Sequence, residues 1–152
     1  MIPYGLVLDG DALKKYQPYD KSMPKRKRKS EPLHVIKQST IRDAGNGAFA
    51  AKNIAAGTLL GEYKGKKVSK KAFESAKDTT YMFQISYKGR PQHYIEGNED
   101  CWLRYINGAK GKQQRSKINV KSYQYRKKIW YRTTRAVNKG EEFIMDYGDN
   151  FW

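Results

Sequence analysis

The feature that most constrains this fold is a series of short β-forming runs that begins at Leu33 and continues through the rest of the chain. These runs are rich in β-branched and aromatic residues and are separated by glycine-containing turns, which is typical of strands. Because the runs are short and closely spaced, they favour a mainly β, largely antiparallel fold over βαβ units. The pattern predicts strands at residues 34–41, 59–63, 81–87, 92–96, 128–134 and 142–146, with extended structure at 48–51.

Turns and short helices complete this mainly β fold class. Gly45-Asn46-Gly47 predicts a tight turn, because glycine and asparagine tolerate positive φ. Residues 69–77 favour one short helix, with Ser69 as its N-cap. Further turns are expected at residues 54–58 and 88–91, and a short helix or turn at 101–107.

Residues 1–32 differ from the rest of the chain. They hold four prolines, and only residues 11–16 favour a short helix. The basic run Lys25–Lys29 follows a proline, and like charges at this density repel, so we expect an exposed segment. We interpret the run as a nuclear import signal or a polyanion contact, with a solvated arm as the alternative. The predicted organisation is an N-terminal arm over 1–32 and a folded domain over 33–152.

The chain carries a net charge of +16, from 31 Lys and Arg against 15 Asp and Glu. This charge favours acidic partners such as DNA or nucleosomes over a merely solvated basic surface. Residues 110–128 contain eight Lys or Arg and no acid, and the aromatics Tyr123, Tyr125 and then Trp130 are interleaved with these cations. Cations mixed with aromatics suit nucleic acid, so Lys110–Lys128 is the predicted DNA contact, with a long exposed loop and a solvated strand as the alternative. Acidic residues that suit a basic peptide are Glu96, Glu99 and Asp100.

Metal, disulfide and membrane roles are not expected. Cys101 is the only cysteine, so the chain cannot form an intramolecular disulfide or a cysteine-based zinc cluster. His34 and His93 are the only histidines, too few for a typical histidine metal site. We find no long apolar stretch that would predict a membrane span or a secretory signal.

Three blocks of sequence occur in an order that carries more information than any one block. The first is Gly45 to Ala50, followed by Gly57 to Gly65. The second is Trp102 to Ala109, and the third runs from Thr134 to Gly148. Together they resemble the SET domain of protein lysine methyltransferases, and their motifs are most similar to those of the PR subclass. The resemblance implies a β-clip of several small antiparallel sheets with a knot-like C-terminal segment.

The resemblance also implies an activity. SET domains transfer a methyl group from S-adenosylmethionine (SAM) to a lysine, often on a histone tail, and release S-adenosylhomocysteine without a metal. Such an in-line displacement needs an aligned, desolvated and neutral amine, and a tyrosine-lined channel supplies these conditions. A nuclear location follows, which would be the host nucleus if the chain is viral. A basic nucleic-acid-binding β protein without a cofactor would explain the charge but not the three blocks.

Site residues follow from the resemblance, position by position. Tyr147 and Tyr81 match the catalytic tyrosines, although Tyr81 also suits packing on the core. Arg104 matches a cofactor-side residue, with an ion pair to Glu62 or Asp146 as the alternative. The predicted cofactor-binding set is Gly45, Asn46, Gly47, Arg104, Asn107 and Gly108. The predicted substrate channel is lined by Phe83, Tyr105, Met145, Phe151 and Trp152.

The chain departs from the family pattern in three places. Gly108-Ala109 stands where most SET domains have His-Ser, which leaves a catalytically weak chromatin- or DNA-binding PR module as the alternative function. Met145 stands where many relatives have Phe or Tyr, which leans towards higher methylation states. No cysteine-rich post-SET segment is expected, so we expect Phe151 and Trp152, the N-terminal arm or the second subunit of a homodimer to close the channel.

Overall fold

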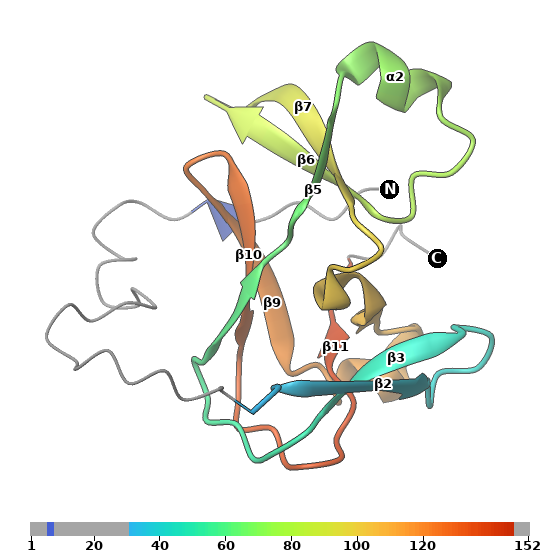
Figure 1. Ribbon diagram of the computed structural model, residues 1–152, viewed down its shortest axis with the longest axis vertical. Helices are drawn as coiled ribbons and strands as arrows, with labels where there is room; N and C mark the ends of the chain where they lie inside the picture. The colour runs from blue at the N-terminus through green and yellow to red at the C-terminus, as the bar shows by residue number, and fades with distance from the viewer. Residues whose placement is uncertain (1–5, 8–30, 148–152) are drawn as a thin grey trace, which may run out of the picture.

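The structure, a computed structural model, describes residues 6–7 and 31–147 (Figure 1). Most of its regular structure is β, and its helices are short. The strands are β1 (Leu6–Val7), β2 (His34–Gln38), β3 (Asn46–Ala50), β4 (Leu59–Glu62), β5 (Gly65–Val68), β6 (Met82–Tyr87), β7 (Arg90–Gly97), β8 (Asn107–Gly108), β9 (Val120–Tyr125), β10 (Lys128–Thr133) and β11 (Ile144–Met145). The helices are α2 (Lys70–Ser75), α3 (Gly111–Arg115) and the 3-10 turn η1 (Trp102–Tyr105).

The strands form three sheets, which confirms the predicted fold class. The largest has the order β4-β10-β9-β11-β8, with β1 also paired to β9; the others are β2-β3 and β5-β7-β6. The largest sheet is mixed, because β11 runs parallel to both β8 and β9 and β1 runs parallel to β9. The C-terminal strand therefore enters the sheet between two strands formed earlier in the chain, and the expected knot-like segment takes this form.

An aromatic core joins two of these sheets. Tyr63 follows β4, Phe83 lies in β6 and Tyr131 lies in β10, and all three side chains are buried. The Tyr63 ring lies 4.7 Å from that of Phe83 and 5.7 Å from that of Tyr131, between ring centroids. Aromatic pairs at such distances contribute about 1 kcal/mol beyond their area burial. The core thus fixes the β5-β7-β6 sheet against the largest sheet.

The predicted helix is confirmed, whereas the first predicted turn lies at a different position. The Oγ of Ser69 accepts a hydrogen bond from the Ala72 N–H, which confirms it as the N-cap of α2. The first turn lies earlier than predicted: the Ser39 N–H donates to the Gly45 carbonyl, and β3 already begins at Asn46. Of the two glycines, only Gly45 adopts a positive φ, of 71°.

Residues 110–128 do not form the long exposed loop and solvated strand that were the alternative to a DNA contact. They contain α3 and then β9, which lies in the middle of the largest sheet. Val120 and Tyr123 on β9 are buried. Because the Tyr123 ring is in the core, it is not available to stack on a nucleic-acid base. The two-residue strand β1 falls within the predicted N-terminal arm and was also not predicted.

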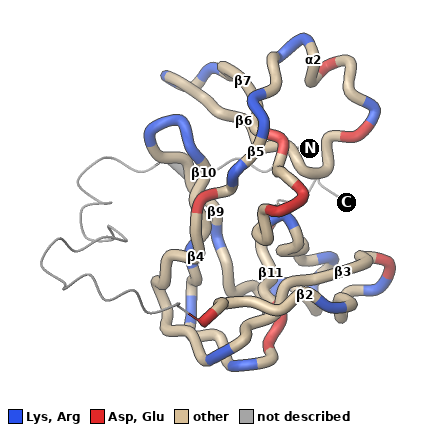
Figure 2. The backbone as a smooth tube through the Cα atoms, viewed as in Figure 1, with Lys and Arg blue, Asp and Glu red and all other residues tan. Residues whose placement is uncertain are grey.

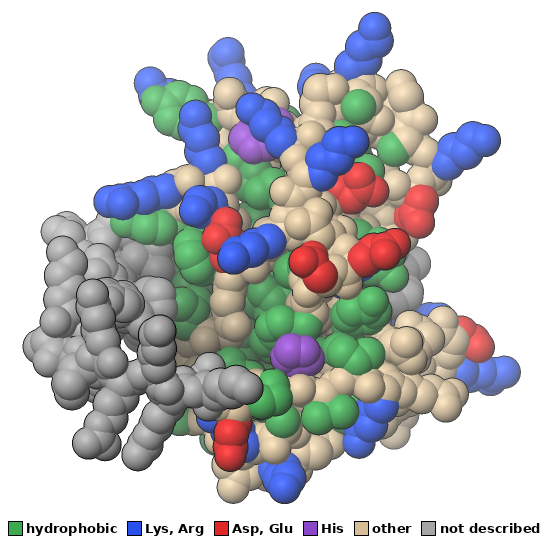
Figure 3. Space-filling model, viewed as in Figure 1, with side chains coloured by type: hydrophobic (Ala, Val, Ile, Leu, Met, Phe, Trp, Pro, Cys, Tyr) green, Lys and Arg blue, Asp and Glu red, His purple; other side chains and the backbone are tan. Residues whose placement is uncertain are grey.

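Charge is unevenly distributed over the described surface. Lys and Arg gather at the ends of the β6–β7 and β9–β10 hairpins, whereas acidic residues gather in the segment that follows β7 (Figures 2 and 3). Glu96, near the end of β7, and Glu99 and Asp100, just after it, are exposed. Among the residues that the structure describes, no helix has the length and apolar character needed to cross a membrane.

Candidate functional site

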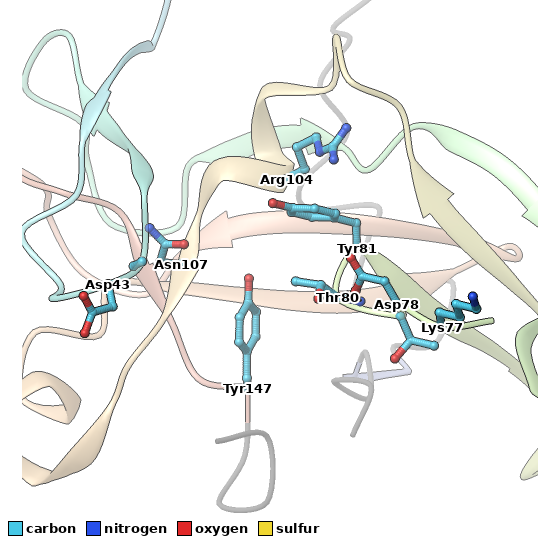
Figure 4. Close-up of a pocket in the computed structure, with 10 residues that line it drawn as sticks. Asp43, Lys77, Asp78, Thr80, Tyr81, Arg104, Asn107 and Tyr147 are labelled. Carbon is cyan, nitrogen blue, oxygen red and sulfur yellow. Dashed lines mark hydrogen bonds between the residues drawn. The ribbon is translucent and has the colours of Figure 1, made fainter.

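One pocket brings together both predicted catalytic tyrosines. It has a volume of about 450 Å³, and its wall comes from the β2–β3 loop, the segment between α2 and β6, the η1–β8 region and Tyr147, two residues after β11. Figure 4 shows Tyr147 pointing between Asn107 and Tyr81, with Arg104 beside the Tyr81 ring. The pocket wall includes the charged, amide and aromatic side chains of Asp43, Asp78, Tyr81, Arg104, Asn107 and Tyr147.

Tyr147 follows β11 and is held by the backbone of the second block. Its hydroxyl donates to the Ile106 carbonyl at 2.6 Å. Burial raises the pKa of Tyr147, and the nearby Tyr81 phenol raises it further. The phenol is therefore neutral throughout the physiological range. Such a group can orient a substrate atom by hydrogen bonding but is not poised to remove a proton.

Gly108 provides the space that the Tyr147 ring occupies. A Cβ at Gly108 would lie 2.1 Å from Cδ2 of Tyr147, far inside van der Waals contact. The backbone pairing of β8 with β11 sets this approach, because Met145 pairs with Gly108 and the Ala109 N–H donates to the Met145 carbonyl at 2.8 Å. The departure from the family's histidine at this position therefore has a packing explanation.

Tyr81 lies on the pocket wall with 36% of its surface exposed, so it is not a core residue as the alternative proposed. Its carbonyl accepts a hydrogen bond from the buried Tyr63 hydroxyl at 2.8 Å, which fixes its backbone. The Arg104 guanidinium carbon lies 3.9 Å from the Tyr81 ring centroid, a cation–π contact. The ion pair between Arg104 and Glu62, which was the alternative to a cofactor-side role, is not formed; Glu62 pairs with Lys128 at 3.7 Å.

The first block reaches the site through its backbone. The Asn107 side-chain amide donates to the Asn46 carbonyl at 3.0 Å and so joins the first block to the second. Gly45 and Asn46 are exposed, and the β2–β3 loop contributes Asp43 and Ala44 to the wall instead. Gly47 does not line the pocket, since a Cβ there would lie 2.3 Å from Oε1 of Glu142.

Glu142 is a buried carboxylate that holds the β2–β3 loop, and sequence reasoning missed it. One carboxylate oxygen accepts from the Ser39 hydroxyl at 2.6 Å. The other accepts from the Thr40 N–H at 2.9 Å and from the Thr40 hydroxyl. A carboxylate with this many donors is well satisfied despite its burial. Its sequence signal was a Glu directly before an apolar run.

Three predicted channel residues lie elsewhere. Phe83 and Met145 are buried in the main core, at 3% and 1% exposure, because β6 and β11 turn these side chains away from the pocket. Tyr105 is half-buried and packs against the same core. The prediction that these three residues line the channel is therefore wrong for the described pocket, because none of them lines it. Phe151 and Trp152 lie outside the described residues.

The segment before β6 supplies a polar rim that the sequence did not reveal. The Asp78 carboxylate accepts from the Thr80 N–H at 2.9 Å and from its hydroxyl at 2.5 Å. These hydrogen bonds lower the pKa of Asp78. Asp43 stands across the pocket from this segment (Figure 4). The pocket thus combines one guanidinium and one amide with carboxylates at its rim.

Comparison with known proteins decides the family. A model of the PR domain of PR domain zinc finger protein 2 matches residues 34–152. This chain belongs to the PR/SET domain family. The PR/SET chain is 31% identical over 122 residues to histone-lysine N-methyltransferase set-17 of Caenorhabditis elegans, covering 78% of this chain and 42% of that protein. It is 29% identical over 137 residues to human histone-lysine N-methyltransferase PRDM7, covering 87% of this chain and 27% of that protein.

Solved structures agree with this fold. The methyltransferase domain of human PR domain-containing protein 2 matches with a TM-score of 0.63 and 20% identity, over 100% of this chain and 94% of that one. A Chaetomium thermophilum polycomb repressive complex 2 chain, solved bound to S-adenosylmethionine, matches with a TM-score of 0.58 and 23% identity, over 80% of this chain and 16% of that one. The PR/SET chain spans less than half the length of the two curated relatives named above.

Proposed function

We propose that this PR/SET domain protein is a SAM-dependent protein lysine N-methyltransferase that acts on histone tails. The observation that carries the proposal is the convergence of Tyr81 and Tyr147 on one pocket with Arg104 and Asn107. These residues come from widely separated parts of the chain, in a family whose matched relatives include proteins named histone-lysine methyltransferases.

The pocket residues fit SAM. The Nε atom of Arg104 is buried and has no hydrogen-bond partner among the described residues, so a ligand carboxylate would satisfy it. Asn107 uses one amide hydrogen on Asn46, and its second remains for the same carboxylate. Asp43 and Asp78 suit a ligand ammonium or hydroxyl group. The pocket volume of about 450 Å³ lies in the usual range for small-molecule sites of about 300–1,000 Å³. When bound, SAM supplies the methyl group as part of a sulfonium ion.

Tyr147 and Tyr81 would prepare the lysine. The Tyr147 hydroxyl donates its only hydrogen to the Ile106 carbonyl. Its oxygen would therefore accept a hydrogen bond from the amine N–H and so orient the amine lone pair, without acting as a base. Burial of the amine among aromatic rings disfavours its ammonium form and lowers its pKa. The lysine therefore loses its proton to solvent before transfer. Arg104, stacked on Tyr81, adds a positive charge that disfavours an ammonium in the same place.

Exposed acidic residues lie beside this pocket, where a basic peptide could bind. The Gly97 N–H donates to the Tyr81 carbonyl at 2.9 Å, so the segment that holds Glu96, Glu99 and Asp100 is attached directly to the pocket wall. These three acidic residues are exposed. Their charge is opposite to that of a lysine-rich histone tail, which supports the histone assignment. We extend the proposal to a nuclear location, with Lys25–Lys29 as the import signal.

The experiment that tests the function is transfer of labelled methyl groups from SAM to histone octamers, nucleosomes and a lysine-peptide array. The matched control is Tyr147→Phe, which keeps the ring but removes the hydroxyl. We expect labelled histone with the natural protein and a large loss with the variant. Absence of transfer to every substrate, or equal transfer by both proteins, would overturn the proposal.

A PR-type binding module without turnover is the second candidate, favoured by Gly108-Ala109 in place of His-Ser. Calorimetry with SAM separates the two, because a module that has lost the cofactor site would release no heat. The basis for predicting higher methylation states is removed, since Met145 is a core residue. Homodimer formation stays a prediction, to be checked by sedimentation.

A further inference from the structure

Two hairpins present their ends side by side at the basic end of the molecule (Figures 1 and 2). The β6–β7 hairpin turns at Lys88-Gly89, and the β9–β10 hairpin turns at Arg126-Lys127. The buried Gln124 side chain joins them, because its Oε1 accepts from the Ser86 N–H at 2.8 Å and its Nε2 donates to the Ser86 carbonyl at 2.7 Å. We call residues 86–90 and 124–128 the hairpin-tip surface.

The turn residues on this surface are unfavourable for the backbone they adopt. Lys88 and Arg126 both have a φ of 48°, and Lys127 has a φ of 59°. Two-residue turns with positive φ favour Asn-Gly, because other side chains crowd the backbone there. The β9–β10 turn instead places a cation at both central positions. Strain of this kind tends to persist where function requires the residue, so the cations need a functional explanation.

Positive charge on the hairpin-tip surface is only slightly compensated. No Asp or Glu occurs in residues 82–95 or 120–133, which include both hairpin ends. Glu62, on the neighbouring β4, pairs with Lys128 at 3.7 Å. The pKa of His93 is lowered by burial and then by Lys67 and Lys127, as expected in a positive field. The exposed cations are Lys88, Arg90, Arg126, Lys127 and Lys128.

A recess of about 490 Å³ lies between the two tips, and its wall includes Tyr87, Lys88, Arg126 and Lys127. The Tyr87 side chain is 54% exposed. A phenol beside cations can donate a hydrogen bond to a phosphate oxygen while its ring packs against sugar. The surface therefore offers charge, hydrogen-bond donors and an aromatic ring in one rigid arrangement.

We propose that the hairpin-tip surface binds the phosphate backbone of duplex DNA. The choice of DNA rests on the proposed histone substrate, because a nucleosome presents a basic tail together with DNA. The acidic segment beside Tyr81 suits the tail, and the hairpin-tip surface suits the DNA. This assignment replaces Lys110–Lys128 as the contact, since that segment contributes only its last residues and buries Tyr123.

The test measures the affinity of the whole chain for a fluorescent 30-base-pair duplex across several salt concentrations. Arg126→Asn with Lys127→Gly removes two charges and installs the preferred turn residues. The matched control, Lys112→Gln with Lys117→Gln, removes two exposed charges elsewhere. We expect the tip variant to bind at least tenfold more weakly and its salt slope to fall by about 2, while the control stays within about twofold.

Equal losses in the tip variant and the control would overturn the proposal, because net charge alone would then explain binding. Tighter binding to vesicles containing phosphatidylserine than to duplex DNA, with the same dependence on the tip, would also overturn it in favour of a membrane. The assay contains neither SAM nor histone. Failure of methyl transfer to a free histone peptide, with tip-dependent DNA binding intact, would therefore refute the proposed activity alone.

Discussion

The pocket around Tyr147 and the hairpin-tip surface are built in opposite ways. The pocket gathers groups from widely separated segments, and buried side chains such as Glu142 fix its walls. The hairpin-tip surface comes from two local turns and carries exposed cations in a strained backbone. Function in the first region depends on the position of single atoms. Function in the second depends on summed charge, which single changes reduce only in part.

The largest expected effect is confined to the pocket. Tyr147→Phe removes the hydroxyl that donates to the Ile106 carbonyl and would orient the lysine amine. We expect the methyl-transfer rate to fall about 100-fold, the typical cost of misplacing a reacting group. Initial rates with labelled SAM measure this loss. An accompanying fall in duplex affinity would break the separation between the two regions.

Glu142→Gln tests whether a buried carboxylate holds the pocket wall. The glutamine amide has only one acceptor oxygen, so at least one donor of Ser39 or Thr40 loses its partner. We expect a loss of about 2 kcal/mol in the free energy of unfolding, measured with urea. Glu141→Gln is the control: its pair with Arg135 is partly exposed, and its loss should cost under about 1 kcal/mol. Equal losses would contradict the assignment.

Gly108→Ala tests the close approach of Tyr147 to the backbone. The added Cβ would overlap Cδ2 of Tyr147, so the ring must move within the pocket. We expect about a tenfold lower methyl-transfer rate, because the phenol remains present but displaced. The change leaves the hairpin-tip surface untouched, so duplex affinity should stay constant. An unchanged rate would show that the phenol position is not critical.

The hairpin-tip variant Arg126→Asn with Lys127→Gly should stabilise the fold, in contrast to Glu142→Gln. Relief of two positive-φ positions occupied by large side chains is expected to raise the free energy of unfolding by about 1 kcal/mol. Urea unfolding measures the gain, and the DNA assay measures the accompanying loss. A destabilised variant would show that the two cations stabilise the turn, and the strain argument would fail.

The smallest expected effect is a change in the pKa of His93 when a charge on the hairpin-tip surface is removed. Lys67 and Lys127 lower the pKa of His93, after burial as the main cause. Lys127→Gln should therefore raise the His93 pKa towards its ordinary value. His34 is the internal control, because burial alone lowers its pKa. Titration of both imidazoles by NMR checks the difference, and equal movement of the two would contradict it.

Sequence reasoning succeeded where local pattern and structure agree. Ser69 caps α2 as predicted, and Tyr81 meets Asn107 of the second block and Tyr147 of the third block at one pocket. It failed at β9, where Lys121 and the turn cations surround the buried Tyr123. The sequence there predicts a DNA contact, or an exposed loop and a solvated strand, and gives no sign of a central strand with a buried face.

Side-chain direction was the second source of error. Met145 and Tyr147 lie two positions apart, but β11 ends between them, so one side chain enters the core and the other the pocket. Similarly, the sequence predicts Gly47 as a cofactor contact and gives no sign that its missing Cβ makes room for the Glu142 carboxylate. Contacts of this kind join residues about a hundred positions apart, and no local pattern encodes them.

The insertion of β11 between β8 and β9 has a consequence for the order of folding. Until residues 144–145 have left the ribosome, β8 lacks its strand partner and Val120 of β9 lacks its pairing with Met145. Pairings between such distant segments form slowly, so a nascent or partly folded chain is exposed to edge-to-edge aggregation. Tyr147 is delivered by the same strand that closes this gap. Completion of the sheet and assembly of the pocket are therefore a single late step.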